Sequence, residues 1–81
     1  MNQLFERTVE TLKRMDTLIR TKATGTPNEL ARKLNVSPST IYEYLLLMKN
    51  ILGAPIHYCK IRKSYYYSKR GKLNFGFYYE V

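Results

Sequence analysis

The chain has 81 residues, a single cysteine and a formal net charge of +8. A chain of this length forms one domain with a small core, and one cysteine excludes an internal disulfide. Its longest apolar run, Leu45–Met48, is far too short to span a membrane, and the first residues lack the apolar core of a signal peptide. We therefore expect a soluble, cytoplasmic protein.

The positive charge is concentrated toward the C-terminus. Residues 1–35 carry a net charge of +3 and residues 36–50 are neutral, whereas residues 51–81 carry +5 because six basic side chains are opposed by Glu80 alone. Such an excess of one sign attracts polyanions, nucleic acids among them. It is equally typical of a solvated surface that keeps a protein soluble, and the charge alone does not decide between the two.

The first predicted element is a helix from about residue 4 to residue 22. Apolar side chains recur there at intervals of three and four residues, which places them on one face of a helix. They are Phe5, Val9, Leu12, Met15, Leu18 and Ile19. Gly25 is the residue that we expect to stop this helix.

A short second helix is predicted over residues 27–34. Thr26 is a favourable N-cap, Pro27 suits the first turn, and Glu29 completes a capping box with Thr26. Asn35 tolerates the left-handed backbone conformation, so we expect it to end this helix.

A third helix is predicted over residues 38–50, with Ser37 as its N-cap. Gly53 and Pro55 interrupt the helical pattern after it. The apolar stripe of this helix comprises Ile41, Leu45, Met48 and Leu52, and Leu46 and Leu47 widen it.

The period then changes from helical to alternating, which predicts a β-hairpin over residues 56–69. The first strand is expected to reach Ile61, and residues 62–64 form a polar tip. In the returning strand Tyr65 and Tyr67 face the core and Tyr66 faces outward. A further strand is predicted over residues 73–79, where apolar and polar side chains alternate again.

These elements together predict an α+β fold of three helices followed by a small antiparallel sheet. Two short helices joined by the tight turn at residues 35–37 cross at a steep angle, as in a helix-turn-helix. In that arrangement the second of the two helices enters the major groove of DNA while the first braces the backbone.

Two stretches resemble known DNA-binding regulators. ELARKLNVSPSTIY (residues 29–42) is similar to the helix-turn-helix of DeoR-like regulators and of the N-terminal domain of WYL-containing regulators. LGAPIHYCKIRKSYYY (residues 52–67) is similar to the wing of the same proteins. KATGTP (residues 22–27) and NFGF (residues 74–77) also resemble a group of small stand-alone winged-helix proteins. The resemblance implies a winged helix-turn-helix that binds double-stranded DNA and regulates transcription.

The chain departs from that pattern in the helix that would read the bases. Related regulators usually carry basic residues early in this helix and an Arg after the Tyr, whereas this chain has Pro38, Ser39 and Glu43. Arg is the side chain best suited to guanine, so this helix lacks the commonest base reader. We therefore expect binding that is led by the DNA backbone and has a modest sequence preference.

Three groups of residues are expected to contact DNA. The third helix would present to the major groove Ser37, Ser39, Thr40, Tyr42 and Glu43. The N-terminus of the second helix, whose free amides favour anions, would contact phosphate near Thr26 and Asn28. The flanking backbone would be held by Lys60, Arg62, Lys63, Tyr66, Lys69, Arg70 and Lys72.

Other classes of function have weaker support. His57 and Cys59 share a strand face, but zinc needs four ligands and the chain has no second His or Cys. We expect no enzymatic activity, no cofactor, no metal and no small-molecule substrate. Tyrosines beside basic residues are also typical of proteins that bind single-stranded nucleic acid.

The main alternative is a protein-interaction or dimerisation module, because a neutral recognition helix is compatible with that role. The first helix, Leu46, Leu47 and the strand predicted over residues 73–79 would supply its apolar surface. The same surfaces make the chain a candidate homodimer.

Overall fold

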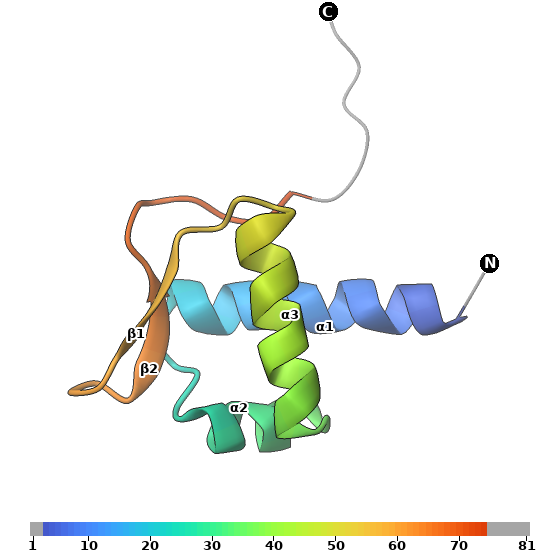
Figure 1. The fold of residues 1–81 in the computed structure, drawn as a ribbon, viewed down its shortest axis with the longest axis horizontal. Coiled ribbons are helices and arrows are strands. Elements are labelled where there is room, and N and C mark those ends of the chain that lie inside the picture. The colour runs from blue at the N-terminus through green and yellow to red at the C-terminus, as the bar shows by residue number, and fades with distance from the viewer. Residues whose placement is uncertain (1–2, 75–81) are drawn as a thin grey trace, which may run out of the picture.

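The computed structural model describes residues 3–74, which form three helices followed by a β-hairpin (Figure 1). The elements in chain order are α1 (Gln3–Arg20), α2 (Pro27–Leu34), α3 (Pro38–Asn50), β1 (Ile56–Cys59) and β2 (Ser64–Tyr67). The predicted α+β class is confirmed. None of the helices in this described part of the chain is long and apolar enough to cross a lipid bilayer.

The starts of α2 and α3 are fixed by side-chain caps, as predicted. Thr26 Oγ1 accepts from the Glu29 amide at 3.3 Å, and the Glu29 carboxylate accepts from the Thr26 amide at 3.0 Å. That backbone hydrogen bond is the main reason why the pKa of Glu29 lies below its ordinary value. At α3, Ser37 Oγ accepts from the Thr40 amide at 3.2 Å. Asn35 ends α2 in the left-handed conformation, with φ 56°.

The end of α1 differs from the prediction. The helix ends at Arg20, and the left-handed residue that terminates it is Lys22, with φ 56°, rather than Gly25. The amide of Lys22 donates to the carbonyl of Ile19, and the next amide donates to that of Leu18. Gly25, with φ +73°, serves a later turn, where an added Cβ would lie 2.9 Å from Cβ of Glu29. The glycine lets the loop pass close to the first turn of α2.

The core forms between the helices and the inner face of the hairpin. Its fully or nearly buried members are Leu12, Met15, Ile19, Leu30, Ala31, Leu34, Ile41, Leu45, Met48, Ala54, Ile56 and Tyr65. Among the residues of the predicted apolar stripes that lie outside it, Phe5 is 64% exposed, Leu46 is 57% exposed and Leu52 is 39% exposed. In Figure 1 the N-terminal end of α1 extends past α3.

The hairpin is shorter than predicted. β1 ends at Cys59, so Ile61 belongs to the tip, and Ser64 belongs to β2 rather than to the tip. The strands pair antiparallel with Tyr58 opposite Tyr65, whose rings pack edge to face with centroids 4.9 Å apart on the inner face. As predicted, Tyr65 is buried and Tyr67 is half-buried.

The strand predicted over residues 73–79 falls mostly outside the described residues. Leu73 and Asn74 belong to no strand, and residues 75–79 lie outside the described residues. Leu73 packs instead against the core, and its amide donates to Asp16 of α1. That hydrogen bond holds the chain against a helix, where a strand would need its amides for pairing.

The hairpin is attached to the helices by buried hydrogen bonds from the loop between α1 and α2. Thr24 is fully buried, and its Oγ1 accepts from the Tyr65 amide at 2.8 Å. Its own amide donates to Ser64 Oγ at 3.2 Å, and the two hydroxyl oxygens are 3.1 Å apart. Thr24 therefore covers the edge of β2 that β1 leaves open.

A second attachment point is the buried carboxylate of Asp16 on α1. Asp16 Oδ1 accepts from the Tyr67 hydroxyl at 2.8 Å and from the Leu73 amide at 3.1 Å. Its Oδ2 accepts from Arg20 Nε at 3.0 Å, which places a cation beside the buried charge. The carboxylate thus connects α1, β2 and the segment after β2.

Replacing Asp16 by Ala should lower the free energy of unfolding by about 1–3 kcal/mol, because the Tyr67 hydroxyl and the Leu73 amide lose their acceptor. Urea denaturation followed by circular dichroism measures the change. Glu10→Ala, at an exposed position of the same helix, is the control and should stay within about 0.5 kcal/mol of the wild type. Equal effects of the two substitutions would contradict the role given to Asp16.

Candidate nucleic-acid interface

The N-terminal half of α3 presents three of the predicted contact residues to solvent. Ser39, Tyr42 and Glu43 are exposed, and the buried side of the helix carries Ile41 and Leu45. This outward face has hydroxyl groups and one carboxylate but no cation. It can form hydrogen bonds with a ligand, yet it supplies no positive charge to a polyanion.

Ser37 and Thr40, which were predicted to face the same groove, are engaged within the helix cap. Their hydroxyl oxygens are 3.0 Å apart, and Ser37 Oγ also accepts from the Thr40 amide. These hydrogen bonds give both residues a structural role at the start of α3.

Tyr42 of α3 acts electrostatically on a tyrosine of the hairpin. Burial raises the pKa of Tyr65 to about 12, and the neighbouring hydroxyls of Tyr42 and Tyr58 add to the rise. Tyr42 itself is 52% exposed on the outward face of α3.

The N-terminus of α2 offers less to an anion than the sequence indicates. Pro27 has no amide hydrogen, and the Glu29 amide donates to Thr26 Oγ1. Glu29 also brings a carboxylate to this helix end through the capping box. Thr26 and Asn28 were both predicted to contact phosphate. Thr26 is engaged in the helix cap, whereas Asn28 is exposed to solvent.

The hairpin tip, residues 60–63, gathers three cations on four residues. Lys60, Arg62 and Lys63 are all exposed. Cys59 Sγ accepts from the Arg62 amide at 3.4 Å, and Lys63 closes the turn with φ 53°. In Figure 1 the tip projects to the left, whereas α3 begins at the lower edge of the molecule, next to α2.

Sequence reasoning missed Ile61 as a surface residue because it extended β1 through it. Ile61 lies between Lys60 and Arg62 at the tip and is 95% exposed. The signal available in the sequence was its position inside the basic run KIRK, which suits a solvated turn better than a buried strand.

The remaining basic residues of the predicted site lie at the other end of the hairpin. The Ser68 amide donates to the Pro55 carbonyl at 2.9 Å and closes the base of the hairpin. Lys69 and Arg70 follow this base and lie beside residues 52–55, which come after the C-terminal end of α3. The structure therefore separates them from the tip and from the N-terminal end of α3.

Tyr66 lies on the outer face of β2, opposite His57 of β1. Their ring centroids are 5.9 Å apart, and Tyr66 is half-buried while His57 is exposed. The outward orientation of Tyr66 agrees with the strand alternation predicted for it.

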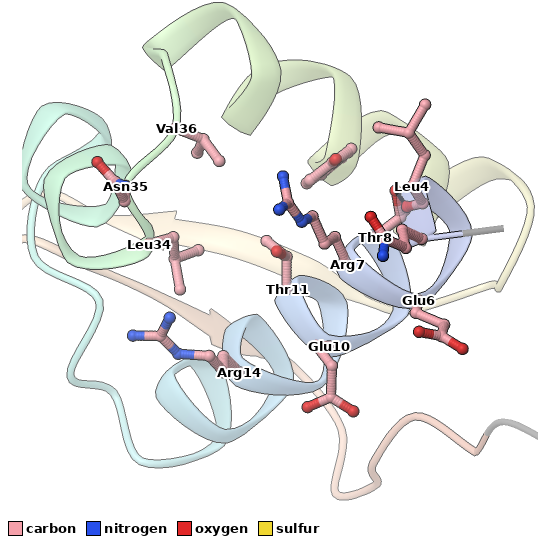
Figure 2. Close-up of a pocket in the computed structure, with 12 residues that line it drawn as sticks. Leu4, Glu6, Arg7, Thr8, Glu10, Thr11, Arg14, Leu34, Asn35 and Val36 are labelled. Carbon is pink, nitrogen blue, oxygen red and sulfur yellow. Dashed lines mark hydrogen bonds between the residues drawn. The ribbon is translucent and has the colours of Figure 1, made fainter.

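A large hollow lies elsewhere, between the N-terminal half of α1 and the turn that joins α2 to α3 (Figure 2). It is open, with a volume of about 860 Å³, and Leu34 and Val36 contribute apolar surface to it. In Figure 2 Arg7 points across the hollow and Glu10 points away from it.

Residues 3–74 contain no group of three or more His, Cys, Asp or Glu side chains placed to hold a metal ion. The free thiol of Cys59 is half-buried and accepts the Arg62 amide. The described residues do form an exposed polar helix end on α3 and a cationic hairpin tip.

Comparison with known proteins found no matching family model, no matching curated protein and no matching solved structure. The functional argument therefore depends on the residues and distances described above.

The alkaline limit of stability should follow Tyr65 together with Tyr67, because burial raises the pKa of both hydroxyls. The folded pKa of Tyr65, about 12, exceeds the ordinary value of 10.0, so the folded state holds this proton more tightly than the unfolded state. The stability that it contributes is complete below about pH 10 and is lost as pH rises toward about 12. Urea midpoints measured over this range should fall less steeply in Tyr65→Phe, and Tyr66→Phe on the opposite face is the control.

Proposed function

We propose that this protein is a winged helix-turn-helix domain that binds duplex DNA and acts as a small transcriptional regulator. The observation that carries the proposal is the pair of exposed surfaces that the fold forms, the cationic hairpin tip and the polar N-terminal half of α3. A helix flanked by a basic hairpin suits a duplex, because the helix fits the major groove and the hairpin follows the adjacent backbone.

In this proposal the hairpin tip supplies most of the affinity. Lys60, Arg62 and Lys63 lie within reach of successive phosphates and release counterions when they bind. Ser39, Tyr42 and Glu43 face the groove, where Glu43 accepts from the amino group of cytosine. Because the N-terminal half of α3 brings no cation, the expected binding depends on the backbone and discriminates weakly between sequences.

Salt dependence tests the role of the tip. Affinity for a mixed-sequence duplex, measured by fluorescence anisotropy, should weaken steeply with salt. Arg62→Ala and Lys63→Ala should each weaken binding and reduce the magnitude of the salt slope by about 1. Lys13→Ala, at an exposed position of α1, is the charge-matched control and should leave the slope unchanged. Absence of binding by the wild type at low salt would overturn the proposed function.

Glu43 tests whether α3 approaches the DNA. A carboxylate at the groove repels phosphates, so Glu43→Gln should tighten binding to mixed-sequence duplex on the order of fivefold. Glu10→Gln, exposed on α1, removes the same charge away from the proposed interface and should have a smaller effect. If the two substitutions raise affinity equally, net charge alone explains the gain and α3 does not lie in the groove.

A protein-interaction module is the second candidate, and it is favoured by apolar side chains at the C-terminal end of α3. Leu46 is 57% exposed and Ile51 is 76% exposed. Their apolar surface would suit a partner protein or a second copy of the chain. Light scattering of the wild type and of Leu46→Ser measures self-association. A dimer that Leu46→Ser disrupts, together with no DNA binding at low salt, would favour this candidate.

A further inference from the structure

The second basic cluster lies at the base of the hairpin and surrounds a hollow of its own. Arg20 and Lys22, from the end of α1, meet Lys69 and Arg70, which follow β2. The hollow between them has a volume of about 460 Å³, and Ser68 also lines it. We call these five residues and the space between them the basal hollow.

The charge of the basal hollow has one sign. Four cations line it and no acidic residue does. Asp16 neutralises part of this charge from beneath, because its Oδ2 accepts from Arg20 Nε at 3.0 Å. An excess positive charge remains on the other three side chains, whose mutual repulsion is relieved when an anion enters.

The guanidinium of Arg20 is held in place before any ligand arrives. Besides the bond to Asp16, its Nη2 donates to Thr17 Oγ1 at 3.4 Å, and the side chain remains 40% exposed. A positioned guanidinium loses little conformational freedom on binding and suits the oxygens of a phosphate.

Lys22 occupies a backbone conformation that favours another residue. Its φ is 56°, in the left-handed region where glycine or asparagine is the usual choice at a helix end. Lys63 at the hairpin tip is in the same situation, with φ 53°. In both basic clusters, therefore, a lysine occupies a left-handed turn position that glycine would fill with less strain, which is understandable if the charged side chain is what is needed there.

We propose that the basal hollow is a second anion-binding site, which takes phosphate groups independently of the hairpin tip. The antiparallel register places the tip, residues 60–63, and the base, residues 55 and 68, at opposite ends of the strands. Two sources present the same chemistry: the backbone of a second DNA segment, and a free diphosphate or oligophosphate. The site stands on its own residues and does not require the proposed function of the tip.

Pyrophosphate and paired duplexes test the proposal with the full-length chain. Calorimetric titration with sodium pyrophosphate at low salt should detect binding by the wild type. The double variant K69Q/R70Q should bind pyrophosphate more weakly by about tenfold or more, because each lost charged hydrogen bond has a substantial cost. The control K13Q/K49Q removes the same charge from positions outside the hollow and should bind like the wild type.

Lys22→Gly separates binding from folding. Glycine relieves the left-handed strain, so thermal unfolding of this variant should occur at or above the wild-type temperature while its pyrophosphate affinity falls. A loss of affinity in a protein that is no less stable cannot result from unfolding.

The two sources are distinguished by energy transfer between donor-labelled and acceptor-labelled duplexes. If a second duplex occupies the hollow, the wild type brings the labels together, and K69Q/R70Q still binds one duplex but does not pair two. Pyrophosphate binding without such pairing assigns the hollow to free phosphates. The proposal is overturned if the wild type neither binds pyrophosphate nor pairs two duplexes. It is also overturned if K69Q/R70Q matches K13Q/K49Q in both pyrophosphate binding and duplex pairing. Loss of single-duplex binding in Arg62→Ala tests the proposed role of the hairpin tip and does not bear on the basal hollow.

Discussion

The structure depends most on how the hairpin is attached to the helices. A two-stranded hairpin of four-residue strands has little stability of its own in water. Thr24 supplies the missing edge, because its hydroxyl accepts from the Tyr65 amide and its amide donates to Ser64. Without these buried hydrogen bonds, the hairpin tip would have no fixed position relative to α3. The basic surface of the tip and the polar surface of α3 could then not bind one ligand together.

Local signals explain why the helices could be predicted from the sequence. The caps at Thr26 and Ser37 and the left-handed Asn35 involve residues within a few positions of one another, so the bounds of α2 and α3 follow from the sequence. The end of α1 did not follow from the sequence. Glycine is the usual left-handed residue after a helix, so Gly25 was the expected stop, whereas a lysine such as Lys22 gives no such signal. Only the three-dimensional path of the loop shows that Gly25 is needed against Glu29.

The candidate site could be predicted in part, for the same reason. Lys60, Arg62 and Lys63 are neighbours in sequence and remain neighbours in space. Lys69 and Arg70 are also close in sequence, but the chain turns at the base of the hairpin and carries them toward the end of α1. Their partner Arg20 is fixed by Asp16, a buried carboxylate on an otherwise apolar helix face, and no local pattern predicts which distant groups such a carboxylate binds.

The hydrogen bonds of Asp16 also bear on the order in which the molecule opens. They join residues 51 and 57 positions apart, whereas the caps of α2 and α3 join residues three positions apart. Closing long loops has an entropic cost that short-range contacts do not have. The segment after β2 and the outer end of the hairpin therefore form the unit expected to detach first in partial unfolding, while α1, α2 and α3 remain folded. A ligand that holds both ends of the hairpin would protect its amides from hydrogen exchange more than those of the helices.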